Sequence, residues 1–341
     1  MKKSRTVRLF SGAAVVSTLA ASALAFVGTG ANPAGAAGKK FTVGFVVGAE
    51  ADPFFQSMYV GASKEAKALG INLIWSGDPV DYSPATQLPI IQQVLAEKPN
   101  ALVVAPTDTK ALNSVMAQAV KQGIPVFNVD SGSSVQSNIT AWVTGNNVQG
   151  GQAAADALAA ALKYKTACTK AKKCVVAVGV SSVTTSTDAA RLLGFNQELK
   201  KKYPNITALN PVVSQSQPSV AQSGFSQDIA AHSLAGIFAI DGTDAEGAAS
   251  AIAAAGSAGA NIKVVGYDSY ATNIANMQAG KLAAIVAQQP TLEGKLIIQY
   301  AYDRLVHKNA RGIPHLQTLP NILLTPQNCA KLCSTYVYVA S

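Results

Sequence analysis

Strand-length apolar runs alternate with helix-length stretches along nearly all of the chain beyond residue 40. Parallel strands need a crossover connection, usually a helix, so this alternation predicts βαβ units and parallel sheets. Ten or more strands exceed a comfortable single sheet, which favours two sheets in two domains. The expected strands are 41–48, 71–77, 101–106, 125–130, 141–146, 174–180, 206–214, 234–241, 263–268, 282–288 and 319–325. The helical stretches include 84–98, 108–122, 147–164 and 290–308.

The first 37 residues have the order of a secretory signal: a basic start, an apolar middle and small residues at the end. An uncleaved membrane anchor is the alternative, and Ser11, Gly12 and Ser17 interrupt the apolar stretch that it would need. No cysteine precedes Cys168, which argues against a lipid attached to a cysteine at the mature N-terminus. We therefore expect export to the periplasm or the outer face of the membrane without a lipid anchor.

The charge of the chain gives no sign of a nucleic-acid partner. The formal net charge is +9, and removal of the signal with its four basic residues leaves 23 basic and 18 acidic residues, a net charge of +5. Basic residues form only short clusters, such as 200–202, without interleaved aromatic residues.

Four cysteines form two close pairs, Cys168 with Cys174 and Cys329 with Cys333. Four cysteines allow three connectivities, and an exported chain favours oxidation. We expect local pairing within each close pair. A zinc site is the alternative, although the spacing is not Cys-x-x-Cys and no histidine lies close by.

The first strand leads directly into an acid and two aromatic residues, Asp52, Phe54 and Phe55. In open α/β sheets ligands bind beyond the carboxyl ends of strands, where these residues are expected. Each also has an ordinary structural explanation. Asp52 is a suitable helix N-cap before Pro53, and Phe55 begins a helical stripe of apolar residues typical of a core.

Polar side chains also end several later strands: Asp130, Asp241, Asp268 and Gln288. One terminal aspartate is more often a cap or a turn former. Together with Asp52 they make five such residues at strand ends, and these would line one cleft because the strand ends share one edge of the sheet. Carboxylates accept hydroxyl hydrogens and an aromatic ring covers an apolar face, so the set predicts a site for a small polyol.

Seven segments together resemble the ribose-type periplasmic binding proteins, the receptors of bacterial ABC sugar importers, which share a fold with effector domains of the lactose-repressor family. The segments are DPFFQSMYVGASKEAKALG, PTDTKAL, PVFNVD, TGNNVQGG, ARLLGF, VVGYDS and AAIVAQQP, spread over about residues 41–325. The resemblance implies two doubly wound αβα domains with parallel sheets, joined by three crossovers and closing on a ligand between them.

The resemblance also implies lobe boundaries and residue roles. One lobe would comprise 38–145 and 289–317, and the other 146–288 and 318–341. Crossovers would lie near Gly145 and Asn146, near Gln288 and Gln289, and at Leu316 to Pro320, so that Gly145, Asn146 and Gln289 are hinge residues. The implied ligand positions are Asp52, Phe54, Phe55, Asp130, Ser131, Gln215, Asp241, Asp268 and Gln288.

Four positions depart from the ribose receptors. Ser131 and Ala189 stand where arginines are common, Gln215 where an aromatic ring is expected, and Ala105 where an amide is frequent. Arg191 matches a second arginine, which we interpret as structural. The departures argue against ribose itself, and residues 181–188 are similar to receptors for deoxysugars and for a furanosyl quorum signal.

No matched lysine or arginine balances the cleft acids, so we expect a neutral or cationic ligand, a monosaccharide or polyol. The resulting prediction is a monomeric solute-binding protein that delivers this ligand to an ABC permease, without metal or cofactor. A signalling receptor is the second hypothesis. An exported glycosidase-like enzyme with paired acids is the third hypothesis. It is disfavoured because the acids end strands in both halves of the chain, and because the chain lacks a Walker loop, a Gly-x-Ser-x-Gly elbow and a His-Glu-x-x-His motif. A transcription regulator would need a helix-turn-helix where the export signal stands.

Overall fold

The computed structural model of the chain describes residues 40–339. The predicted export signal at residues 1–37 lies outside the described part. Within residues 40–339 two separate sheets are present, as the number of expected strands required. No helix in this part combines the length and the apolar character needed to cross a membrane.

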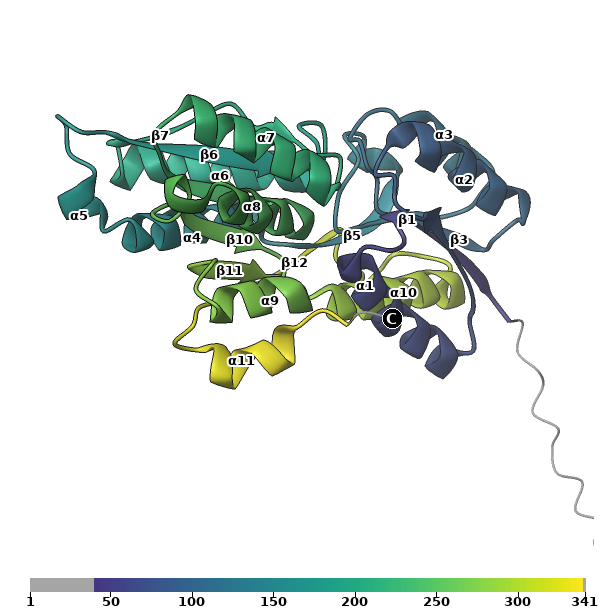
Figure 1. The fold of residues 1–341 in the computed structure, drawn as a ribbon. Coiled ribbons are helices and arrows are strands. Elements are labelled where there is room, and N and C mark those ends of the chain that lie inside the picture. Colours follow the sequence, from purple (N-terminus) through teal and green to yellow (C-terminus); the bar gives the residue numbers. More distant parts are fainter. Residues whose placement is uncertain (1–39, 340–341) are drawn as a thin grey trace, which may run out of the picture. The chain divides into compact units, whose positions relative to one another are not determined.

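The first sheet has six strands in the order β12-β5-β4-β3-β1-β2, and all neighbours are parallel. The strands are β1 (Thr42–Ala49), β2 (Asn72–Asp78), β3 (Ala101–Val104), β4 (Val126–Val129), β5 (Ile139–Gly145) and β12 (Leu316–Leu319). Its helices are α1 (Pro53–Leu69), α2 (Pro84–Ala96), α3 (Asn113–Lys121) and α10 (Pro290–His307). We call this sheet and its helices the first lobe (Figure 1).

The second sheet follows the order β13-β11-β10-β9-β6-β7, with β8 also paired to β6. Its strands are β6 (Cys174–Val180), β7 (Ile206–Ala208), β8 (Val212–Val213), β9 (Leu234–Ala239), β10 (Lys263–Tyr267), β11 (Ala284–Ala287) and β13 (Ile322–Leu324). Its helices are α4 (Asn147–Ala161), α6 (Ser186–Lys202), α7 (Pro218–Ala231), α8 (Gly242–Ala254) and α9 (Ala271–Gln278). We call this assembly the second lobe.

Four short elements complete the described chain. They are the 3-10 turns η1 (Gln136–Asn138) and η2 (Gly256–Ala258), and the helices α5 (Tyr164–Ala167) and α11 (Cys329–Tyr336).

Each sheet has an apolar core on both faces, which is the packing expected of buried parallel strands. In β1, Val43 and Phe45 pack with α1 and α10, whereas Val46 packs with α2 and α3. In β9, Phe238 packs toward α4 and α6, and Ile237 packs toward α7, α8 and α9. The successive side chains of one strand thus serve opposite layers, and both lobes are αβα sandwiches as predicted.

Two expected strands are each divided in the structure. The run at 206–214 forms β7 and β8, and the run at 319–325 is replaced by β12 and β13. Pro211 and Pro320 lie at the interruptions, where they cannot donate a ladder hydrogen bond. After the interruption at Pro320 the chain changes sheets: β12 pairs with β5 in the first sheet, and β13 pairs antiparallel with β11 in the second.

Both expected disulfides are confirmed by the structure. One joins Cys168, at the end of α5, to Cys174, at the start of β6. The other joins Cys329 to Cys333 within α11. The described residues contain no free cysteine.

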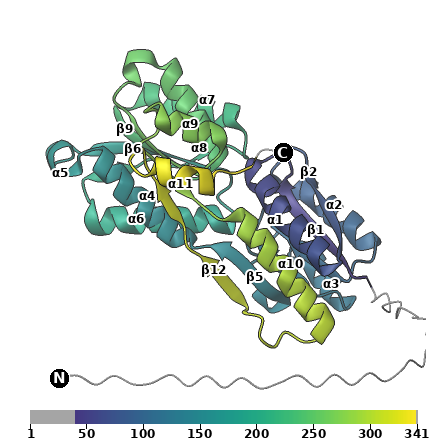
Figure 2. The same ribbon diagram turned by 90° about the horizontal axis from the view of Figure 1, so that it is seen from below.

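The helices α1 and α10 lie side by side on the first sheet (Figure 2). Their contact depends on two glycines. A Cβ atom added at Gly61 would lie 1.9 Å from the Thr291 carbonyl oxygen, and one added at Gly294 would lie 2.2 Å from the Met58 carbonyl oxygen. Neither backbone oxygen can move aside as a flexible side chain would, so the helix spacing requires hydrogen at both positions.

Replacing Gly61 with alanine should therefore force α1 and α10 apart. We expect the free energy of unfolding to fall by about 1–3 kcal/mol, the usual cost of overpacking, as measured by urea unfolding. Lys67→Ala, at an exposed position of α1, is the control and should change it by less than about 0.5 kcal/mol. Wild-type stability of Gly61→Ala would contradict this description of the helix contact.

Candidate functional site

The carboxyl ends of strands from both lobes meet around one small cavity of about 40 Å³. Its lining includes seven residues predicted from the sequence: Asp52, Phe54, Phe55, Asp130, Asp241, Asp268 and Gln288. Seven further lining residues were not predicted as ligand positions: Tyr82, Ser181, Thr187, Asp188, Arg191, Ser216 and Tyr270. Larger hollows exist elsewhere on the surface, but they do not gather the strand-end acids Asp130, Asp241 and Asp268, which line this cavity.

Asp52, Phe54 and Phe55 each support the fold of the first lobe and also line the cavity. The carboxylate of Asp52 caps α1 by accepting the Phe54 N–H at 2.8 Å, and it also accepts the Tyr270 hydroxyl of the second lobe. Phe54 and Phe55 are buried in the first core and also line the cavity. The two explanations considered for each residue are therefore compatible.

Asp130 and Asp268 occupy equivalent places in the two lobes. Asp130 follows β4 and Asp268 follows β10, and each adopts a left-handed backbone conformation, with φ of 56° and 62°. Aspartate tolerates this conformation better than most residues. The chain thereby turns at the strand end with each carboxyl group beside the cavity.

Hydrogen bonds from the second lobe hold Asp241 and Asp268. Asp241 accepts the hydroxyl of Thr243 at 2.8 Å, and it accepts the hydroxyl of Ser181. Asp268 accepts Gln288 Nε2 at 2.8 Å and the backbone N–H of Gly242 at 3.2 Å. These bonds fix the direction of both carboxylates before any ligand is present.

The expectation that no cation balances the acids is wrong. Arg191 lines the cavity and is 3% exposed, with its guanidinium carbon 4.0 Å from the centroid of the Tyr267 ring. Its Nη1 lies 4.0 Å from Asp188 Oδ1. The motif match identified this arginine, but its place beside the acids arises because the first turns of α6, which carry Thr187, Asp188 and Arg191, line the cavity.

Two guanidinium nitrogens of Arg191 are already engaged by the protein. Nε donates to Asn147 Oδ1 at 2.8 Å, and Nη1 donates to the Ile240 carbonyl oxygen at 3.0 Å. The residue therefore has both a structural role, as interpreted from the sequence, and an electrostatic one.

Two sequence-predicted ligand positions are not part of the lining. Ser131 is buried and donates to the Pro106 carbonyl oxygen at 2.7 Å. Gln215 is exposed, because Gln215 and Ser216 both adopt left-handed backbone conformations in the turn after β8. That turn places Ser216, with its hydroxyl 2.8 Å from Ser181 Oγ, at the cavity instead.

Burial dominates the titration of the cavity acids. It raises the pKa of Asp52, Asp130 and Asp188 to about 7 from 3.8 in each case. Arg191 opposes the shift at Asp130 and Asp188, and the hydrogen bond from Tyr270 opposes it at Asp52. Burial also raises the pKa of Asp268. Despite their number, the carboxylates are not arranged to share an ion, since the described residues contain no cluster that could hold a metal.

Direct hydrogen bonds connect the two lobes beside the cavity. The Thr185 hydroxyl donates to the Thr107 carbonyl oxygen at 2.9 Å, and the Gly132 N–H donates to the Ser186 hydroxyl at 2.7 Å. The cavity has room for about three water molecules at roughly 10–15 Å³ each. The structure is therefore closed over the site, and a larger molecule can enter only if these contacts open.

The three chain connections between the lobes lie together. Asn146, between β5 and α4, donates its N–H to the Leu319 carbonyl oxygen at 2.8 Å. Asn321 Nδ2 donates to the Asn146 carbonyl oxygen at 2.8 Å, and Gln289 Nε2 donates to the Pro320 carbonyl oxygen at 2.9 Å. The third connection thus centres on Pro320 and Asn321, just beyond the expected Leu316 to Pro320, because Leu316–Leu319 is strand β12.

The raised pKa of Asp52 predicts a pH-dependent stability. A carboxyl group that binds its proton more tightly when folded stabilises the protein fully below pH 3.8, and this contribution is lost as the pH rises through about 7. Asp52→Asn keeps the N-cap and should flatten the decline in unfolding free energy between pH 4.5 and 7.5. The difference from wild type should stay below about 1.4 kcal/mol per pH unit, because a single carboxyl group takes up at most one proton on folding.

Urea unfolding at several pH values measures this difference. Glu97→Gln, at the exposed end of α2, is the control and should follow the wild-type curve. Parallel curves for Asp52→Asn and wild type would contradict the prediction.

Comparisons with known proteins agree with this architecture. Residues 43–309 match the family described as periplasmic binding protein domain. The ribose import binding protein of Bacillus subtilis is 31% identical over 276 residues, covering 80% of this chain and 84% of that protein.

Two solved structures are also similar. A solute-binding protein of an ABC transporter from Agrobacterium vitis, bound with α-D-tagatopyranose, has a TM-score of 0.81 and 28% identity, covering 88% of this chain and all of that one. A carbohydrate transporter solute-binding protein from Agrobacterium radiobacter, in complex with D-arabinose, has a TM-score of 0.80 and 26% identity, covering 88% of this chain and 99% of that one. From the family match and the fold, we conclude that the chain belongs to the periplasmic binding proteins, a family of binding proteins and not of enzymes.

Proposed function

We propose that this protein is the exported solute-binding component of an ABC importer, and that it captures a small neutral sugar or polyol between its two lobes. The observation that carries the proposal is the meeting of strand-end carboxyl groups from both sheets with two buried phenylalanines at one cavity. The sugar-binding relatives support the same class of ligand.

The cavity offers acceptors that a sugar hydroxyl can satisfy. Asp130 Oδ1 and Gln288 Oε1 are buried and have no hydrogen-bond partner among the described residues. A buried acceptor without a donor is costly, so a ligand rich in hydroxyl groups would restore what the protein leaves unpaired. The rings of Phe54 and Phe55 would cover the C–H face of such a ligand.

The presence of Arg191 modifies the argument for a neutral ligand without reversing it. Two of its nitrogens are already bonded to the protein, so it does not offer an unoccupied fork to a phosphate or a carboxylate. Asp130 and Asp188 surround it. A neutral ligand therefore avoids bringing a second anion among several carboxyl groups.

Capture would proceed by hinge closure. The hydrogen bonds that join the lobes beside the cavity must open before a sugar can enter, and three adjacent connections join the lobes. We propose that Gly145, Asn146 and Gln289 absorb the torsional change. The lobes would comprise 38–145 with 289–317 and 146–288 with 318–341, with the last boundary adjusted to the end of β12 at Leu319.

The partner would be a membrane permease that recognises the closed form. The protein would act as a monomer, without a lipid anchor, after removal of residues 1–36 or 1–37. N-terminal sequencing of the secreted protein tests the cleavage site.

Calorimetric titration of the mature protein with D-ribose, D-arabinose, D-tagatose, a polyol, a sugar phosphate and a sugar acid tests the ligand class. We expect one of the neutral compounds to bind and the two anionic ones to fail. Small-angle scattering should show a more compact protein at saturation than in the ligand-free open state. Tight binding of the phosphate or the acid, with no response to neutral compounds, would overturn the proposal.

Asp130→Ala and Asp268→Ala should each weaken sugar binding by about 1.5–3 kcal/mol, the range for a hydrogen bond to a charged group. The matched control is Asp156→Ala, which removes a half-exposed carboxylate on α4 that pairs with Lys202. Calorimetry with the sugar bound by wild type measures the three affinities. Near-wild-type binding by both cleft variants would mean that these acids serve only the fold.

A further inference from the structure

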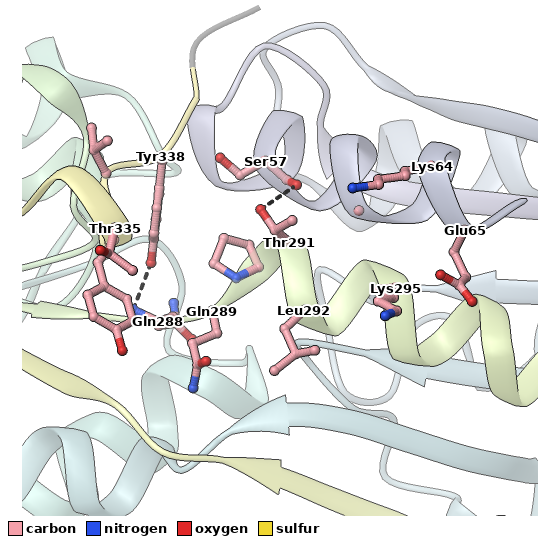
Figure 3. Close-up of a pocket in the computed structure, with 14 residues that line it drawn as sticks. Ser57, Lys64, Glu65, Gln288, Gln289, Thr291, Leu292, Lys295, Thr335 and Tyr338 are labelled. Carbon is pink, nitrogen blue, oxygen red and sulfur yellow. Dashed lines mark hydrogen bonds between the residues drawn. The ribbon is translucent and has the colours of Figure 1, made fainter. Parts of the chain in front are cut away.

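The last described residues return from the second lobe to the first. After α11, the Tyr338 N–H donates to the Ser269 carbonyl oxygen at 3.0 Å, just beyond β10. The next residue, Val339, donates its N–H to Ser57 Oγ on α1 at 2.8 Å. We call residues 337–339 the C-terminal strap. Figure 3 shows it passing from α11 to the start of α1, with Tyr338 pointing toward Gln288.

The Tyr338 hydroxyl joins two residues of the ligand cavity. It accepts the Gln288 N–H at 2.9 Å and donates to Asp268 Oδ1 at 3.0 Å. Gln288 Nε2 donates to the same carboxylate oxygen at 2.8 Å. The three groups thus form a closed set of hydrogen bonds, in which the hydroxyl binds both partners from outside the lining.

The ring of Tyr338 supports the cavity on the same side. It is 3% exposed and lies with its centroid 5.8 Å from that of Phe54 and 6.0 Å from that of Tyr270. Tyr338 therefore contacts four lining residues without lining the cavity itself. Its surroundings include residues of both lobes, since Phe54 lies on α1 and Tyr270 precedes α9.

Hydrogen bonds hold the strap at both ends, at Tyr336 before it and at Val339 within it. The disulfide Cys329–Cys333 lies within α11, and Ser269 Oγ donates to the Tyr336 carbonyl oxygen. A hollow of about 380 Å³ borders the strap between α1 and the start of α10 (Figure 3). Contacts on the cavity side and at Ser57 therefore hold the strap. The family match ends at residue 309, so these contacts come from a part of the chain beyond it.

We propose that Tyr338 is a positioning residue of the ligand site, whose hydroxyl holds Asp268 and Gln288 in the arrangement that receives the ligand. This inference rests on the proposed function and adds to it a residue that acts through others. The ring alone could fill space, so the claim concerns the hydroxyl. Removal of that group would leave the buried Gln288 N–H without an acceptor and Asp268 with one donor fewer.

Tyr338→Phe separates the two roles because it keeps the ring. Titration with D-ribose, D-arabinose and D-tagatose should show about ten-fold weaker binding of the sugar that wild type binds. Tyr336→Phe is the matched control, since its hydroxyl makes no hydrogen bond to Asp268 or Gln288 within the described part of the chain. This control should bind like wild type.

The pH profile of binding gives a readout that space filling would not change. Burial raises the pKa of Asp268, and the hydrogen bond from Tyr338 is among the contacts that lower it. Without the hydroxyl, Asp268 should take up its proton at higher pH. The affinity of Tyr338→Phe should therefore begin to fall at a higher pH than that of wild type. The charged and titratable groups interacting with Asp268 are Arg191, Asp241, Asp52, Asp130, Tyr267, Tyr270, Tyr338 and Glu293. Tyr336→Phe keeps all of these groups, and Tyr338→Phe removes only the Tyr338 hydroxyl.

Amide hydrogen exchange of the ligand-free protein provides an independent measurement. Peptides that contain Gln288 should exchange faster in Tyr338→Phe than in wild type or Tyr336→Phe. Wild-type affinity, pH profile and exchange in Tyr338→Phe would overturn the inference while leaving the proposed function intact. If wild type binds the sugar phosphate or the sugar acid and none of the neutral compounds, the proposed function is contradicted instead, and the exchange experiment alone decides whether Tyr338 positions Gln288.

Discussion

The burial of several carboxyl groups around one arginine is the constraint on which the cleft depends. A buried charge is expensive unless it is paired or neutralised, and this structure uses both solutions. Arg191 lies among Asp130, Asp188 and Asp268, and burial raises the pKa of all three acids. The protein can therefore assemble the acids in one place because part of their charge is compensated and part is suppressed by protonation.

The separate cores of the two lobes favour a site that opens and closes between them over a rigid pocket. Each lobe has its own double-sided core, so the lobes are stable without large apolar surfaces between them. The contacts across the cleft include polar ones, such as those of Thr185 and Ser186, beside the packing of the Tyr270 ring in the first-lobe core. Polar contacts can exchange for water when the lobes separate, whereas an apolar interface would resist opening.

Some residues of the cavity could be predicted from the sequence and others could not. The acids that end strands are found easily, because the apolar run before each of them marks a strand end. Tyr82 and Tyr270 lie in loops, with no periodic pattern around them that indicates which way a ring points. The Gln215 prediction missed the cavity by one residue, because two consecutive left-handed residues reverse the direction of the turn. Tyr338 carried no sequence signal, since its partners Asp268 and Gln288 lie 70 and 50 residues away.

The sequence by itself determined the αβα layering, the two sheets, the local disulfides and the strand-end acids. These features depend on apolar periodicity and on short spacings that neighbouring residues define. Only the tertiary structure decided which strand Leu316–Leu319 joins, that Arg191 shares a cavity with the acids, and that the C-terminal strap passes behind Asp268. Those outcomes depend on contacts between residues far apart in the chain, whose geometry is set by how complete layers pack against each other and not by any local pattern.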